Sequence, residues 1–127
     1  MPVPSASAGL VVSACRTLTA SLPTSLDTGV DRRPVTGDAS RTAAWGDPPI
    51  TLECGVPLPD QTVTPLRIDG FPLVTVEKAG VVTYTTSDRA VNARVTIPRS
   101  YDDQTYLVLP LLAALKKLPS AQAAPGP

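Results

Sequence analysis

Apolar residues recur at helical spacing near both ends of the chain. Between residues 8 and 22 they return at intervals of four, three and four, which predicts an amphipathic helix that Pro23 ends. A similar stripe between residues 107 and 118 predicts a second core helix. Pro110 would remove a backbone bond from the interior of that helix, so its regular part is expected to begin at the proline.

A period of two marks the centre of the chain. Residues 50–56 alternate between apolar and polar, which predicts a half-buried strand with Cys54 on its inner side. The β-branched runs at 73–78 and 81–86 flank a glycine and predict a hairpin. Residues 91–97 alternate again and predict a fourth strand. Because short turns join the last three strands, an antiparallel meander is expected.

The order of these elements predicts a two-layer α+β domain. A four-stranded, mostly antiparallel sheet is expected to carry an N-terminal and a C-terminal helix on one face, with one disulfide. Residues 26–42 are interpreted as a long irregular connection. The domain is predicted to span residues 8–118, between a disordered N-terminal linker at 1–7 and a disordered C-terminal tail at 119–127.

The two cysteines, Cys15 and Cys54, both fall on the apolar side of their local patterns. A disulfide between them would close a loop of about forty residues and add about 4 kcal/mol of stability by the chain-entropy estimate. Such a bond indicates an oxidising compartment, because cytosolic thiols are kept reduced. Two unlinked thiols in the core are the alternative.

Composition narrows the expected partners and chemistry. Eleven cations balance eleven anions, and no cationic stripe of the kind that neutralises phosphates is present, so we expect no nucleic-acid partner. The chain has no histidine, which excludes imidazole-based triads and the usual zinc sites in their ordinary forms. Its glycines do not form a phosphate loop, so no nucleotide is expected to bind. We therefore expect neither a metal nor another cofactor.

A resemblance to a known family centres on residues 43–57, which read AAWGDPPITLECGVP. Further marks are Cys15 in an early helix, RRP at 32–34, TSDR at 86–89 and Tyr101 before a Leu-rich terminal segment. The chain resembles an actinobacterial family known only as a domain of unknown function (thirty-five-fifteen). The resemblance implies a small exported or membrane-anchored envelope protein with no assigned activity.

The N-terminal residues point to a different compartment from the cysteines. Residues 1–10 lack the features of a signal peptide, and no stretch is long and apolar enough to span a bilayer. The two indications agree if the chain is a piece of a longer protein whose export signal or anchor has been removed. We therefore expect an extracytoplasmic location, secreted or anchored at the outer face of the cell membrane, with membrane contact only through the removed segment.

Two clusters are candidate binding sites. Trp45 and Asp47 precede a predicted strand, where the ring could stack on a sugar and the carboxylate could orient it. A structural role explains the same residues, with Trp45 filling one end of the core and Asp47 accepting backbone bonds. The second cluster would be an ion pair or an anion clamp, with a solvated turn as its alternative, and it comprises Asp88, Arg89, Arg32 and Arg33.

The sequence favours a non-catalytic binding or assembly module of the cell envelope, whose unidentified partner is an envelope protein or a glycan. The first alternative is a small envelope hydrolase that uses Asp47 or Asp88 as acid or base and Trp45 as a sugar platform. A carrier of apolar ligands is the second alternative, and it would need an apolar cavity between the sheet and the helices.

Overall fold

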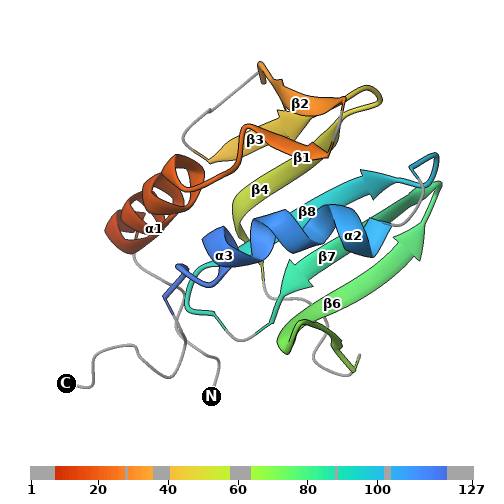
Figure 1. Ribbon diagram of the computed structural model, residues 1–127. Helices are drawn as coiled ribbons and strands as arrows, with labels where there is room; N and C mark the ends of the chain where they lie inside the picture. The colour runs from red at the N-terminus through yellow and green to blue at the C-terminus, as the bar shows by residue number, and fades with distance from the viewer. Residues whose placement is uncertain are drawn as a thin grey trace.

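An eight-stranded antiparallel sheet forms most of this protein (Figure 1). The computed structural model describes residues 8–27, 29–35, 41–57, 64–87, 89–101 and 104–119. The strands are β1 Ser25–Asp27, β2 Val30–Arg33, β3 Thr42–Trp45, β4 Ile50–Val56, β5 Leu66–Ile68, β6 Phe71–Lys78, β7 Val81–Thr86 and β8 Asn92–Pro98. Their order across the sheet is β1-β2-β3-β4-β8-β7-β6-β5, so β4 and β8 meet at its centre.

Four adjacent strands, β4, β8, β7 and β6, are those that the sequence pattern indicates. β4 and β7 have the predicted bounds, while β6 and β8 differ from the prediction by one or two residues at an end. A tight turn joins β6 to β7, and both of its residues, Ala79 and Gly80, have positive φ (54° and 81°). Because glycine adopts this conformation without steric cost, Gly80 suits the hairpin.

The predicted four-stranded architecture is wrong, because four further strands extend the sheet on both sides. Three of them, β1 to β3, lie within or at the ends of the segment interpreted as irregular. They have three or four residues each, too few for a period of two to become visible. β3 is also buried at three consecutive positions, so it does not alternate at all. These strands are defined by pairing with their neighbours, which is a tertiary effect.

The helices also differ from the predicted ones at their ends. α1 spans Ala8–Ala20, and Leu22 lies beyond its end although its side chain is buried. The C-terminal helical segment consists of α2 Gln104–Val108, the 3-10 turn η1 Leu109–Leu111 and α3 Leu112–Leu115. Pro110 stands in η1 near its start, where a missing N–H costs little. Helical structure therefore begins before the proline rather than at it.

The helical segments cover one face of the sheet, and the core lies between the two layers (Figure 1). The side chains of β4 that point into this core alternate with polar ones, as the sequence predicts. The predicted disulfide is confirmed: Cys15 of α1 is bonded to Cys54 of β4, with Cα atoms 5.6 Å apart. Both cysteines are buried, so the bond links the helical layer to the central strand from inside the core.

The opposite face of the sheet, called the outer face below, carries mainly polar side chains. Thr51 is paired with Thr96, and Thr96 with Thr83, so three threonines form a row across β4, β8 and β7. In the next row Glu53 is paired with Arg94, and a guanidinium nitrogen of Arg94 lies 3.8 Å from Glu53 Oε1.

The prediction of disordered ends falls almost entirely outside the described residues. Residues 1–7 and 120–127 are not among them, so the linker and the tail stay predictions.

Candidate functional site

Trp45, the first of the candidate residues, lies inside the protein. Its side chain is fully buried in the core cluster, and the indole Nε1 donates a hydrogen bond to the carbonyl of Pro23 at 3.0 Å. Arg32, its cross-strand neighbour, covers the ring, with the guanidinium carbon 5.5 Å from the ring centroid. In this position the indole cannot stack on a ligand, and its contacts are those of a structural residue.

The loop that follows Trp45 connects β3 to β4 and is held by two hydrogen bonds from other segments. The N–H of Gly46 donates to Asp31 O at 2.9 Å, and the Tyr101 hydroxyl donates to Pro48 O at 2.7 Å. Gly46 has a φ of +72°, and a Cβ at this position would overlap the Tyr101 hydroxyl. The peptide bond between Asp47 and Pro48 is cis. Glycine is therefore required here both by the backbone conformation and by the close approach of the tyrosine.

Asp47 points away from this framework. Its side chain is 93% exposed, and its carboxylate lies 3.9 Å from a guanidinium nitrogen of Arg33. The same nitrogen donates to Gly46 O at 2.7 Å. The structure thus brings two of the predicted site residues together, Arg33 and Asp47, in an exposed ion pair of the kind that contributes little stability.

Arg89 contacts a different part of the molecule, the end of the C-terminal helical segment. Its Nη1 donates to the carbonyls of Lys116 and Leu118, at 3.4 and 2.9 Å, and so satisfies carbonyls at the end of the C-terminal helical segment. The guanidinium carbon also lies 4.9 Å from the centroid of the Phe71 ring. Asp88, which the prediction places in the same cluster, lies outside the described residues. Since β3 and β4 separate β2 from β8, Arg89 is not placed with Arg32 and Arg33.

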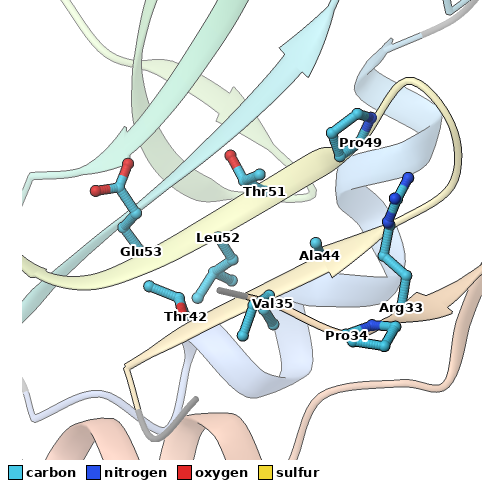
Figure 2. A pocket seen from close by; sticks show the side chains of 10 residues that line it. Arg33, Pro34, Val35, Thr42, Ala44, Pro49, Thr51, Leu52 and Glu53 are labelled. Atoms are coloured by element: carbon cyan, nitrogen blue, oxygen red, sulfur yellow. The ribbon is translucent and has the colours of Figure 1, made fainter. Parts of the chain in front are cut away.

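A groove of about 400 Å³ opens on the outer face where β2 leaves β3 (Figure 2). Proline has no N–H to donate to a strand ladder, and β2 ends at Arg33, directly before Pro34. The pairing with β3 ends there, and the groove is lined by the residues on both sides of this point. The described residues of its lining are Arg33, Pro34, Val35, Thr42, Ala43, Ala44, Pro49, Thr51, Leu52 and Glu53.

Among the described residues of the lining, the two charged ones lie at opposite ends of the groove. Figure 2 shows Arg33 beside Pro49 at one end and Glu53 at the other, with Thr51 between them. The side chain of Arg33 is 43% exposed and that of Glu53 48% exposed. The groove therefore offers a cation, hydroxyl groups and a carboxylate in sequence, and none of the described lining residues is aromatic.

Sequence reasoning identified Arg33 as a candidate but missed Glu53 and Thr51. The signal that could have found them is the polar half of the alternation in residues 50–56, which places both side chains on one face of the strand. The groove itself could not be found in this way. It depends on Pro34 and Val35, which belong to a segment interpreted as irregular.

Two features are absent from the described residues. No three histidine, cysteine, aspartate or glutamate side chains gather there in a way that could hold a metal ion. In the same part of the chain, no helix has both the length and the apolar character needed to cross a bilayer.

Comparison with protein families supplies the identification. The model of the family described as "Protein of unknown function (DUF3515)" matches residues 1–123, nearly the whole chain. The chain belongs to the DUF3515 family. Comparisons with curated proteins and with solved structures give no match. The DUF3515 membership agrees with the resemblance carried by the Trp-Gly-Asp-Pro segment, which the structure now shows to be the β3–β4 loop.

Proposed function

We propose that this DUF3515 protein is a non-catalytic binding or assembly module that acts outside the cytoplasm, in the envelope of an actinobacterial cell. The observation that carries the proposal is the buried disulfide between Cys15 and Cys54. Its loop-closure contribution of about 4 kcal/mol is comparable with the net stability of a small domain. A protein that depends on such a bond is suited to an oxidising compartment, where the bond persists.

The outer-face groove supports a binding role. It is the size of a small-ligand site, and its charged ends and hydroxyl groups provide the few polar groups that orient a ligand. The side chains of Arg33 and Glu53 are both accessible from solvent. A ligand or a partner segment can therefore reach them without any rearrangement of the core.

The two alternative functions gain no support. A hydrolase that uses Trp45 as a sugar platform would need an accessible ring, and this ring is fully buried. A carrier of apolar ligands would need space between the sheet and the helices, whereas the groove lies on the other face of the sheet. Apolar side chains from both layers form the core cluster between them.

The proposal is tested by sedimentation of the purified protein with cell-wall and membrane fractions from the organism that encodes it. The wild-type protein is expected to co-sediment with one of these fractions. The double variant Arg33→Gln/Glu53→Gln should stay in the supernatant. The control Arg67→Gln/Glu77→Gln, which removes the same charges from β5 and β6, should behave as wild type. If the wild type binds neither fraction, the proposed binding role is wrong. If both double variants bind as the wild type does, the groove is not the site of binding.

A further inference from the structure

We infer that the outer-face groove binds a short extended peptide with a free carboxylate and a free ammonium group. This inference rests on the proposed function and specifies the class of ligand that the groove binds. The peptide carboxylate contacts Arg33, and its ammonium group contacts Glu53.

The charges at the two ends of the groove carry the inference. A guanidinium has five N–H donors in a planar fork that matches a carboxylate, and the bond from Arg33 to Gly46 O uses one of them. Glu53 offers carboxylate oxygens to an ammonium group, and its present neighbour, Arg94, is 3.8 Å away. The existing ion pairs of Arg33 with Asp47 and of Glu53 with Arg94 are long and exposed, so each contributes little stability. A ligand that replaces them therefore loses little free energy by doing so.

The separation of these two charges sets the length of the ligand. Arg33 is paired with Ala44 and Ala44 with Thr51, so Arg33 lies two strands from β4, and Glu53 lies two residues farther along β4. Two strand spacings and two residues of rise correspond to roughly 12 Å between the two Cα atoms. An extended tripeptide spans about 10 Å. The flexible side chains of arginine and glutamate cover the difference.

The middle of the groove suits a peptide better than a glycan. Thr51 places a hydroxyl group there, which can donate to and accept from a peptide backbone. Pro34 and Pro49 supply apolar contact for small side chains. Sugar rings commonly pack on accessible aromatic faces, and no described residue of the lining provides one, because Trp45 points into the core on the other side of the sheet.

The experiment uses trialanine and two blocked forms of it as probes. The ¹⁵N-labelled protein is titrated with trialanine, trialanine amide and N-acetyl-trialanine while backbone amide shifts are followed by NMR. Trialanine is expected to shift the amides of Ala44, Thr51 and Glu53, with a dissociation constant of about 0.1–1 mM for a ligand of this size. Each blocked form should bind about three- to fivefold more weakly, as expected for loss of one exposed charge contact.

Charge variants then assign each end of the peptide. In Arg33→Gln, trialanine and its amide should bind equally well, while the acetylated form stays weaker. In Glu53→Gln, trialanine and its acetylated form should bind equally well, while the amide stays weaker. Asp47→Asn should strengthen the binding of trialanine about twofold, because it removes a competitor for Arg33. The control variants Arg67→Gln and Glu77→Gln should bind all three peptides as the wild type does.

Three results would overturn the inference. The first is the absence of shifts at the groove with about 10 mM trialanine. The second is binding that does not distinguish the blocked peptides, or that loses the distinction equally in the control variants. The third is a stronger response of the same amides to triacetylchitotriose, which would make the groove a glycan site. If co-sedimentation with envelope fractions still depends on Arg33 and Glu53, only the peptide inference fails and the binding role stands.

Discussion

Removal of the disulfide is expected to cost the protein a large part of its stability. The bond joins residues that are 39 positions apart, and closing a loop of that length in the unfolded chain corresponds to about 4 kcal/mol. For a chain of this size, that loss lowers Tm by about 12–24 °C. The double variant Cys15→Ala/Cys54→Ala should lose somewhat more, because both sulfur atoms are buried and alanine leaves their space unfilled.

Urea denaturation followed by circular dichroism measures both effects. Three samples are compared: oxidised wild type, wild type refolded in reductant and the double alanine variant. The difference between oxidised and reduced wild type measures the effect of the cross-link. The difference between reduced wild type and the double alanine variant measures the effect of the buried sulfur atoms. The m-value should rise when the bond is absent, because the unfolded chain then exposes more surface. A difference below about 1 kcal/mol between oxidised and reduced wild type would refute the reasoning. The bond would then be dispensable for the fold.

Three further substitutions test the structural roles of the candidate residues by thermal denaturation. Gly46→Ala should lower the stability by about 2–3 kcal/mol, because Gly46 has a positive φ and an added Cβ would overlap Tyr101. The control Gly29→Ala should lower it by only about 1 kcal/mol, because Gly29 also has a positive φ but has free space around it. Equal losses of stability in the two variants would contradict the contact with Tyr101. Arg89→Gln should cost about 1–2 kcal/mol through its lost bonds to the C-terminal carbonyls, and an unchanged Tm would exclude that role. Asp47→Asn should change Tm by less than about 2 °C, and a larger fall would assign the carboxylate to the scaffold.

The central strands could be predicted from the sequence because their side chains report burial directly. β4 separates the helical layer from solvent, so its residues alternate, and Cys54 falls on the inner side as the pattern indicates. The pairing with Cys15 follows from the same argument, since both cysteines lie on faces that pack against each other. A strand of six to eight residues with one face in solvent can therefore be predicted from its alternating pattern alone.

The edges of the sheet could not be predicted, because their sequences carry no such signal. β2 reads Val-Asp-Arg-Arg and is exposed after its first residue, so nothing in it separates a strand from a charged loop. β3 has small buried residues on both faces, and β1 and β5 have only three residues each. Their conformation is set by the neighbouring strand, which a single-sequence pattern does not show.

The candidate site was only partly accessible to sequence reasoning. Trp45 and Asp47 are two residues apart and were considered together, yet the indole is buried and the carboxylate is 93% exposed. Arg33 was recognised as a candidate, but its partner is Asp47 rather than the distant turn. Glu53 becomes a candidate only when the structure shows that it lines a groove together with Pro34 and Val35.

The redox state of Cys15 and Cys54 in living cells tests the account most directly. Cells of the encoding organism are quenched in acid, free thiols are blocked with one maleimide, and the protein is then reduced and labelled with a heavier maleimide for mass spectrometry. The account predicts that nearly all of the protein carries two heavy labels. It also predicts that protease added outside the cytoplasmic membrane, in a parallel sample that is not quenched, degrades the protein. Recovery of the protein with two light labels, protected inside the cytoplasm, would contradict it.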